Sequence, residues 1–362
     1  MDGFLLQSLL NGSSIVTDLN GNIVWSSPSD LSLLTRPQTG GTFLGIFENN
    51  AADPSHQYFR EFDLAGITIA ETNAAQVNQQ LLLRGGHAIN AFHHEARKLS
   101  NGNYLVLANS ERILTNVQGP GPVDVIGDTI LVFDQNLQLQ WFWDAFDHLD
   151  NSRVAPLGET CAPGNAGCAP WYLATIANDW LHGNALQFTP DGNILYSMRN
   201  QDWVIKIDYS NGAGTGNVIW RLGLAGDFQI NSSDPSPWFS HQHDANFQSD
   251  NISFTIFDDG NTRQASNPAA HSRGQMLQID QQNRVATLVL NADVGTYSSA
   301  VGSAQLLPNG NYHFDSGFIE TASGNLVSQS VEVNPSGTTV FGVGFAAIEY
   351  RTFRMPDLYT AP

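Results

Sequence analysis

The sequence predicts an all-β protein that folds as a six-bladed β-propeller, with an active site near the central channel. One observation is a hairpin pattern that occurs six times along the chain. A second is a shorter hairpin that precedes several of these copies and completes a four-stranded unit. The composition agrees, because 33 Gly, 16 Pro and only 14% charged residues are typical of a loop-rich β protein.

The first hairpin consists of a β-rich run, an Asp or Asn, a short turn and a second β-rich run. Its six copies cover residues 15–25, 59–69, 130–141, 204–220, 276–289 and 331–340. All copies share the polar turn residue, which is Asp18, Asp63, Asp134, Asp208, Asp280 or Asn334. Such a side chain accepts hydrogen bonds from the backbone of its own turn, so we interpret these residues as structural.

The second hairpin has an Asn-Gly-Asn or Asp-Gly-Asn turn and occurs at residues 101–107, 191–196 and 309–314. Its glycine supplies the positive φ that such a turn needs. Two consecutive hairpins make a four-stranded antiparallel sheet, which is one propeller blade. We therefore expect residues 1–362 to form a single propeller domain. In it, residues 1–90 are the less regular first blades, and segment 341–359 pairs with the first blade to close the ring.

The net charge of −19 argues against nucleic-acid binding, which needs a basic surface, and against binding to an anionic membrane. No apolar run reaches the length of a transmembrane helix. The first residues lack both the basic segment and the long apolar segment of a signal peptide. An acidic exterior still permits a locally basic pocket, because net charge describes the surface and not the site.

Cys161 and Cys168 are the only cysteines, and a short Gly- and Pro-rich loop joins them. This spacing favours a disulfide over two free thiols, and a disulfide favours an exported protein. We therefore expect a periplasmic or secreted protein whose leader is absent from this sequence. Two sulfurs without a neighbouring histidine do not predict a metal site.

Three groups of histidines stand at the start of predicted inner strands: His93 with His94, His182, and His241 with His243. These strands belong to successive blades, so we expect the side chains to converge near the axis. Asn184 and Arg199 lie close to His182 in the same hairpin. Imidazole, amide and guanidinium together predict a positive, donor-rich pocket for an oxyanion of sulfur or phosphorus. We interpret the remaining histidines as surface or packing residues: His56, His87, His148, His271 and His313.

Short motifs follow one another from about residue 90 to the end of the sequence. They are His93-His94-Glu95, Asp179-Trp180-Leu181-His182-Gly183-Asn184 with Ser197-Met198-Arg199, Gln242-His243-Asp244-Ala245, and segments 303–311 and 350–359. In these motifs the chain resembles the bacterial PAPS-independent aryl sulfotransferases (arylsulfate sulfotransferases). The Asp-Trp-x-His-x-Asn motif with its Arg is the most specific part. That family consists of six-bladed propellers, which agrees with the hairpin count.

The resemblance implies that a sulfuryl group moves from a phenolic sulfate ester to a phenolic acceptor through a sulfohistidine, with no cofactor. It implies His243 as the nucleophile, with His94, His182 and Arg199 as further catalytic residues. We expect three more residues to bind substrate: Asn184, His241 and His93. Two pairs stay open, because His241 competes with His243, and strand alternation would point only one of His93 and His94 inward.

The expected partners are small-molecule aryl sulfates and phenols, with no nucleic acid and no membrane insertion. The oligomeric state stays open. No Gly-rich phosphate loop precedes a helix, so we do not expect a 3′-phosphoadenosine donor. Two alternatives remain: a metal-dependent polysaccharide lyase, whose ion the histidines would hold, and a non-catalytic binding propeller. The lyase leaves Arg199 without a role, and the binding propeller leaves the inner histidines without one.

Overall fold

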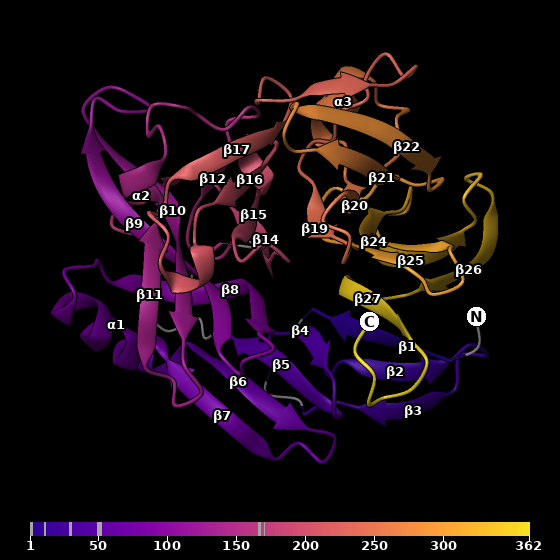
Figure 1. Ribbon diagram of the computed structural model, residues 1–362, viewed down its shortest axis with the longest axis horizontal. Helices are drawn as coiled ribbons and strands as arrows, with labels where there is room; N and C mark the ends of the chain where they lie inside the picture. Colours follow the sequence, from indigo (N-terminus) through magenta and orange to yellow (C-terminus); the bar gives the residue numbers. More distant parts are fainter. Residues whose placement is uncertain (1–2, 11, 29–30, 49–52, 166–167, 170) are drawn as a thin grey trace.

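The computed structural model describes residues 3–10, 12–28, 31–48, 53–165, 168–169 and 171–362 (Figure 1). Six β-sheets surround one axis; four of them have four strands, and the other two carry additional strands. The prediction of an all-β, six-bladed β-propeller is therefore confirmed.

In each blade the strands follow one another from the channel outward. From its innermost strand, the first blade contains β27 (Glu349–Met355), β1 (Phe4–Leu9), β2 (Ile15–Asp18) and β3 (Ile23–Ser26). The second contains β4 (Leu33–Gln38), β5 (Thr42–Phe47), β6 (Tyr58–Asp63) and β7 (Thr68–Asn73). The third contains β8 (Ile89–Lys98), β9 (Tyr104–Thr115), β10 (Pro122–Phe133) and β11 (Leu139–Asp144).

The fourth blade contains β14 (Gly183–Phe188), β15 (Ile194–Met198), β16 (Trp203–Ile207) and β17 (Val218–Gly223). The fifth contains β19 (His243–Phe247), β20 (Ser253–Asp258), β21 (Arg273–Asp280) and β22 (Val285–Asp293), followed by β18 (Gln229–Asn231). The sixth contains β23 (Ser303–Leu306), β24 (Tyr312–Glu320), β25 (Leu326–Val333) and β26 (Thr339–Phe345).

The helices are short and lie in the connections. They are α1 (Ala74–Leu83), α2 (Ala145–His148), α3 (Asn261–Ser266) and the 3₁₀ turns η1 (Pro54–His56), η2 (Arg199–Gln201) and η3 (Ser210–Gly212). The side chain of Asn73 caps α1 by accepting a hydrogen bond from the backbone N–H of Gln76. In the described part of the chain, no helix is long and apolar enough to span a membrane.

The polar turn residues have the structural role that the sequence predicted. Asp18, for example, accepts hydrogen bonds from the backbone N–H groups of Asn20 and Asn22, each at 2.9 Å. The other five turn residues likewise accept backbone N–H groups of their own turns. These bonds replace the ones that the turn backbone would otherwise make with water, and they fix each outer hairpin.

The hydrophobic cores lie between neighbouring blades. Phe59 of the second blade packs edge-on against Phe92 of the third, with ring centroids 5.4 Å apart. Similar apolar clusters join the third to the fourth, the fourth to the fifth, the fifth to the sixth and the first to the second blade. Because both faces of the middle strands are covered in this way, the blades form a continuous packed ring.

The sixth and first blades are joined by polar groups. Ser303 Oγ donates to the carbonyl of Thr352 at 2.8 Å, and Gln305 Nε2 donates to the carbonyl of Arg354 at 2.9 Å. The fully buried His313 lies with Nε2 2.8 Å from Thr352 Oγ1. Hydrogen bonds of this kind need defined geometry, so they fix the register of this contact more closely than apolar packing does.

The chain closes its ring with β27, which pairs antiparallel with β1 (Figure 1). The sequence predicted closure by segment 341–359, and the structure divides that segment. Residues up to Phe345 complete β26 at the outer edge of the sixth blade, and closure begins at Glu349. The first two blades are as regular as the others, because each has four antiparallel strands.

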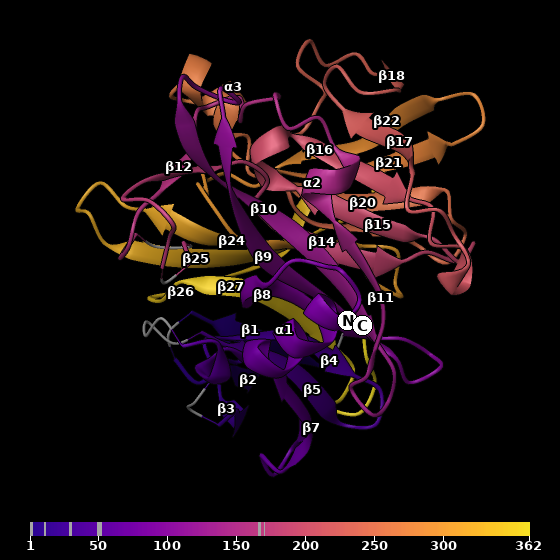
Figure 2. The same ribbon diagram turned by 90° about the vertical axis from the view of Figure 1, so that its left-hand side faces the viewer.

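The third blade has an addition on one face. Strands β9 and β10 are each 12 residues long, and Figure 2 shows them crossing the molecule. Beyond the blade, β10 pairs in parallel with β13 (Ala177–Asp179), and β13 pairs with β12 (Thr160–Cys161). This addition brings Cys161, Cys168, Ala169 and Asp179 next to residues at or beside the inner strands of the third and fourth blades.

Candidate active site

Three histidines from successive blades meet at one end of the channel. His94 lies within β8, His182 immediately precedes β14, and His243 is the first residue of β19. The rings of His94 and His182 contact each other edge to face, with centroids 4.9 Å apart. The hydroxyl of Tyr350 donates to the carbonyl of His94 at 2.6 Å and to that of Asn184 at 3.4 Å. Asn184 Nδ2 donates at 2.7 Å to the carbonyl of Gln242, the residue before His243. The structure therefore brings the three histidine-bearing segments together.

A β-bulge presents each of these histidines. In β8 the pairing with β9 shifts between Phe92 and Ala96, so that His93, His94 and Glu95 leave the regular ladder. Comparable shifts occur at the start of β14 and of β19. Bulges re-aim side chains and break the inward–outward alternation of a strand. The alternation argument about His93 and His94 therefore does not apply, and the two rings contact each other.

The backbone is left-handed at three of the candidate histidines. His94 has φ of 55°, His182 of 49° and His241 of 52°. Residues other than glycine adopt this conformation at a cost, which surrounding contacts must offset. At His94, the hydroxyl of Tyr350 donates a 2.6 Å hydrogen bond to the backbone carbonyl and holds the bulge in place.

Two of the three histidines are oriented by a carboxylate. His182 Nδ1 lies 2.6 Å from Asp179 Oδ2, and His243 Nδ1 lies 2.7 Å from Asp259 Oδ2. Within the described residues, Nε2 of each ring has no hydrogen-bond partner. Because the carboxylate fixes the hydrogen on Nδ1, the lone pair of a neutral ring is on Nε2.

The electrostatics favour neutral imidazoles at two positions. Burial lowers the pKa of His243 well below its ordinary value, and the charges of Arg199 and His182 lower it further. Burial and the neighbouring histidines do the same for the pKa of His94. Burial also raises the pKa of Asp259 well above its ordinary value. Both rings are therefore uncharged near neutral pH.

The two candidates for the nucleophile, His241 and His243, differ in their surroundings. His241 is fully buried; its Nε2 contacts Glu159 Oε1, and its Nδ1 lies 2.9 Å from Asp202 Oδ1. Burial lowers the pKa of His241, but hydrogen bonds with these two carboxylates raise it above the ordinary value. His241 thus lies between two carboxylates, whereas Nε2 of His243 has no hydrogen-bond partner among the described residues.

Arg199 and Asn184 lie on the fourth blade, next to the histidines. Arg199 is the first residue of η2; Nη1 donates to Asn200 Oδ1 at 2.7 Å and Nη2 to the carbonyl of Ser299 at 3.1 Å. Its buried Nε has no partner among the described groups. Asn184 Nδ2 donates at 2.7 Å to the carbonyl of Gln242, the residue that precedes His243. Asn184 therefore contacts the backbone next to His243, and Arg199 retains a free donor.

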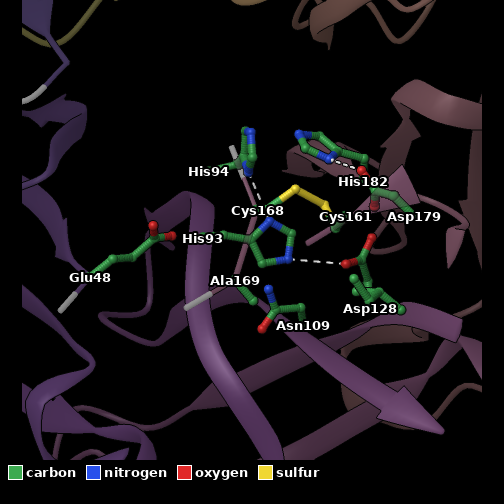
Figure 3. Close-up of a pocket in the computed structure, with 11 residues that line it drawn as sticks. Glu48, His93, His94, Asn109, Asp128, Cys161, Cys168, Ala169, Asp179 and His182 are labelled. Atoms are coloured by element: carbon green, nitrogen blue, oxygen red, sulfur yellow. Dashed lines mark hydrogen bonds and ion pairs between the residues drawn. A yellow bond between two sulfur atoms is a disulfide. The ribbon is translucent and has the colours of Figure 1, made fainter. Parts of the chain in front are cut away.

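A small cavity lies beside His93, His94 and His182 (Figure 3). The predicted disulfide is present between Cys161 and Cys168, whose Cα atoms are 5.6 Å apart, and it forms part of the cavity wall. Segment 159–179 also supplies Glu159 to His241 and Asp179 to His182. The described residues of the disulfide segment thus form part of the wall of the site.

A layer of buried charges lies next to the histidines along the same inner strands. Arg36 on β4 and Arg351 on β27 both pair with Glu95 on β8, each at 3.0 Å. Arg36 also contacts Asp244 on β19. With Arg97, this charged layer has three arginines and two carboxylates, so it carries one surplus positive charge.

Sequence analysis missed Arg36 and the carboxylate partners of the histidines. Asp179 stands three residues before His182 and begins the Asp-Trp-x-His-x-Asn motif, so its signal was present. Asp259 directly follows β20, which pairs with β19, and the register places His243 opposite Phe257. A correct prediction of this register from the sequence would have placed Asp259 near His243. Arg36 and Asp128 come from blades or strands for which the motifs gave no signal.

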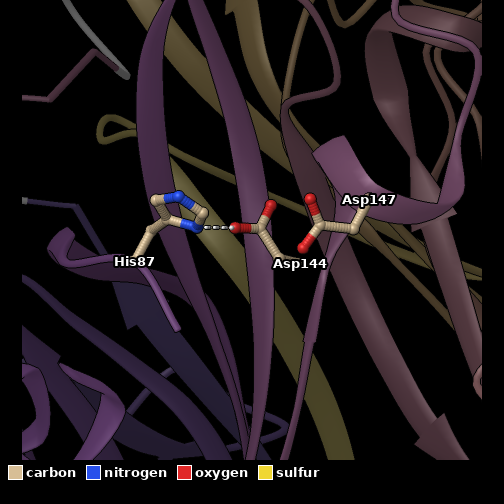
Figure 4. Close-up of side chains that lie close together, drawn as sticks. All are labelled: His87, Asp144 and Asp147. Atoms are coloured by element: carbon tan, nitrogen blue, oxygen red, sulfur yellow. Dashed lines mark ion pairs between the residues drawn. The ribbon is translucent and has the colours of Figure 1, made fainter. Parts of the chain in front are cut away.

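One group of side chains has the composition of a metal site, and it lies elsewhere. His87, Asp144 and Asp147 offer ligand atoms that all lie within 4.8 Å of one another (Figure 4). Arg112 already occupies this position: Nη2 lies 2.6 Å from Asp144 Oδ2 and 2.9 Å from His87 Nδ1, and Nη1 lies 3.2 Å from Asp147 Oδ1. The group is thus an ion-paired cluster around a guanidinium, which repels a cation.

The fold and the site define the chain as a β-propeller in which three histidines, at or beside the inner strands of successive blades, lie near an arginine of the 3₁₀ turn η2. The family model for arylsulfotransferase (ASST) matches residues 4–347, and the chain belongs to that family. It is therefore an aryl sulfotransferase in the broad sense of the family. The match includes the first two blades, which lay outside the motifs that carried the resemblance. No curated protein matches the sequence.

Solved structures share the fold at low sequence identity. A protein of unknown function from Bacteroides caccae is 13% identical, with a TM-score of 0.56, and the match covers 97% of this chain and 98% of that one. A periplasmic gluconolactonase from Pseudomonas aeruginosa is 10% identical, with a TM-score of 0.47 and coverage of 97% and 98%. The similarity to the Bacteroides caccae protein therefore shows a shared fold and nothing about function. We draw no conclusion from the similarity to the gluconolactonase, whose TM-score is lower.

Proposed function

We propose that this protein moves a sulfuryl group from an aryl sulfate to a phenolic acceptor through a covalent intermediate on Nε2 of His243, without PAPS. The observation that carries the proposal is the state of His243. Asp259 holds its Nδ1, its Nε2 has no partner among the described residues, and its pKa is lowered by burial. A neutral nitrogen meets less repulsion from a sulfate ester anion than a carboxylate would.

Transfer of a sulfuryl group resembles phosphoryl transfer in that positioning and electrostatic stabilisation supply most of the catalysis. Arg199 and His182 are the donors for the sulfuryl oxygens. Arg199 has an unpartnered Nε, and His182 is oriented by Asp179 with its Nε2 free among the described residues. The surplus positive charge of the charged layer adds attraction for the anionic substrate.

Asn184 and His241 act by positioning in this proposal, whereas the sequence predicted that they bind substrate. Asn184 fixes the carbonyl of Gln242, next to the nucleophile. His241 ties Glu159 to Asp202 and so joins the disulfide loop to the fourth blade. The disulfide itself supports an oxidising compartment, and we propose that the protein is periplasmic or secreted.

The test is an assay with p-nitrophenyl sulfate as donor and phenol as acceptor. We expect release of p-nitrophenol that depends on phenol, formation of phenyl sulfate, and parallel double-reciprocal lines, because donor and acceptor use one site in turn. The absence of transfer from any aryl sulfate would contradict the proposal and favour a binding propeller. Stoichiometric manganese or calcium in the purified protein would favour the lyase alternative.

A further inference from the structure

Two polar side chains, His93 and Asp128, follow one another behind His94 (Figure 3). His94 Nδ1 lies 2.8 Å from His93 Nδ1, and His93 Nε2 lies 3.0 Å from Asp128 Oδ1. Asp128 is 1% exposed, and its other oxygen accepts hydrogen bonds from the backbone N–H of Gly183, at 2.8 Å, and from the hydroxyl of Tyr196. The carboxylate is thus an ion-pair partner of His93, although His93 Nε2 makes no hydrogen bond with it, and His93 contacts His94 through Nδ1.

The contact between two Nδ1 atoms needs one hydrogen, so one ring donates and the other accepts. The charges around the two rings decide which ring donates. Burial lowers the pKa of His93, but the carboxylates of Asp128, Glu48 and Asp179 raise it above the ordinary value. His94 is surrounded instead by His182, His93, His243 and Arg351, and burial together with these charges lowers its pKa.

His93 is therefore the donor, with hydrogens on both nitrogens, and His94 accepts at Nδ1. A neutral His94 that accepts at Nδ1 carries its single hydrogen on Nε2. That nitrogen is at the opposite edge of the ring and has no hydrogen-bond partner among the described residues. His94 can thus donate the hydrogen on its Nε2 to a substrate, and the hydrogen on His93 Nδ1 is in contact with His94 Nδ1 and can replace it.

We propose that His93 and Asp128 form a proton relay that supplies His94, the general acid and base of the transfer. This inference rests on the function proposed above. In the first half-reaction, the bond between sulfur and the aryl oxygen breaks, and a bond between sulfur and His243 Nε2 forms. The departing oxygen takes the proton from His94 Nε2, and His94 Nδ1 takes the proton from His93 Nδ1.

The relay then serves the second half-reaction without any proton from solvent. After the first step, His94 has a free lone pair at Nε2, and His93 is neutral with its hydrogen on Nε2, toward Asp128. The acceptor phenol gives its proton to His94 Nε2 as its oxygen attacks the sulfur and the bond to His243 breaks. His94 Nδ1 returns its proton to His93, so the cycle ends in the starting state. His93 is a positioning and relay residue, because it acts through His94.

The experiment compares two donors whose leaving groups differ in their need for a proton. Phenyl sulfate releases a poor leaving group, whereas p-nitrophenyl sulfate releases a phenolate that is stable without protonation. For His93→Gln we expect kcat/KM with phenyl sulfate to fall about 100-fold, within the range of general acid catalysis, and with p-nitrophenyl sulfate to fall less than about 10-fold. Asp128→Asn should change the two donors in the same unequal way.

His271→Gln is the matched control, because His271 is exposed and pairs only with Asp293 at 2.9 Å among the described residues. It should leave both donors unchanged. Equal losses with the two donors in His93→Gln would overturn the relay and leave His93 a structural residue. If the unaltered protein transfers from neither donor, the proposed function itself fails. That outcome differs from an equal loss in the variant.

A second measurement needs no variant. In the ¹⁵N-histidine-labelled protein near neutral pH, nitrogen chemical shifts report the hydrogen on each ring nitrogen. We expect one buried ring that is protonated on both nitrogens, hydrogen-bonded to a neutral ring protonated on Nε2. A neutral His93 paired with a doubly protonated His94 would contradict the relay.

Discussion

The histidines and the charged layer occupy neighbouring positions along the chain, but they differ in whether their side chains have partners. His94 is followed by Glu95, His243 by Asp244, and Tyr350 by Arg351. The histidines keep ring nitrogens without partners among the described residues, whereas the carboxylates of the next residue are paired with arginines from other blades. One step along a strand thus separates groups that are free to react from groups that hold the ring together.

This difference shows how a propeller keeps reactive side chains in fixed positions. Catalytic groups need positions defined to a fraction of an ångström by rigid neighbours. Buried ion pairs lose much of their Coulomb energy to desolvation, but breaking one leaves an isolated charge at large cost. The charged layer therefore contributes specificity of geometry. Its surplus charge also adds to the effect of burial, because Arg351 lowers the pKa of both His94 and His243.

The largest effect that separates the two layers should come from His243→Ala. We expect transfer to fall at least about 10⁴-fold, as for other nucleophiles, while the free energy of unfolding changes by less than about 2 kcal/mol. Incubation of the unaltered protein with an aryl sulfate alone should add one SO₃ group, and peptide mapping should assign it to His243. His241→Ala should keep that adduct. A label on His241, or full transfer with intersecting double-reciprocal lines, would contradict the assignment.

Glu95→Gln should give the opposite result. It removes the partner of Arg36 and Arg351, and we expect a loss of about 3–5 kcal/mol in the free energy of unfolding, measured by urea denaturation. The matched control is Asp227→Asn, which weakens the exposed pair with Arg221 and should cost less than about 1 kcal/mol. Equal losses in the two variants would mean that the charged layer adds no special rigidity.

Arg199→Lys tests the proposal that the guanidinium of Arg199 donates to the sulfuryl oxygens of the substrate. Lysine keeps the charge but loses the planar fork of donors. We expect turnover to fall about 100-fold with little change in the urea midpoint, since one preorganised donor to the transition state is lost. Turnover within about twofold of the unaltered protein would remove Arg199 from the site.

Acid should lower the stability of the fold at a higher pH than it stops the chemistry. The unfolded histidines have a pKa of about 6.5 and bind protons that the buried rings of His94 and His243 do not, so the free energy of unfolding falls as pH drops below that value. The lowered pKa values of His94 and His243 keep both rings neutral below the ordinary value of about 6.5, and activity falls as they become protonated. The folded pKa values of Glu95 and Asp244 are also lowered, because burial is outweighed by Arg351 for Glu95 and by Arg36 for Asp244. Their stabilisation is present above the unfolded pKa of about 4 and is lost as pH falls toward the folded values. The urea midpoint and the transfer rate, measured between pH 3 and 8, roughly the range of these groups, should therefore decline at different pH, with the urea midpoint declining first; a rate that falls before the urea midpoint does would contradict this order.

The sequence allowed prediction of the parts of the fold that repeat. Turn residues such as Asp18 and Asp63 make the expected contacts, and the histidines of three successive blades converge as expected. The bulges that present them were not predictable, because a bulge depends on the register of two strands and leaves no composition signal. Asp128 and Asp259 were missed for a related reason, since each reaches its histidine across space from another strand. Arg36 lay in the blade that showed the weakest pattern.

The position of β27 links the timing of synthesis to activity. This strand follows every other described strand in the chain, yet it is the innermost strand of the first blade. Until it is made, β1 to β3 are a three-stranded sheet with an open inner edge, and such edges invite pairing with other chains. Tyr350 and Arg351, which hold His94 and Glu95, arrive with it. A chain truncated before residue 349 therefore contains all ten histidines but lacks the strand whose Tyr350 and Arg351 hold His94 and Glu95 in place.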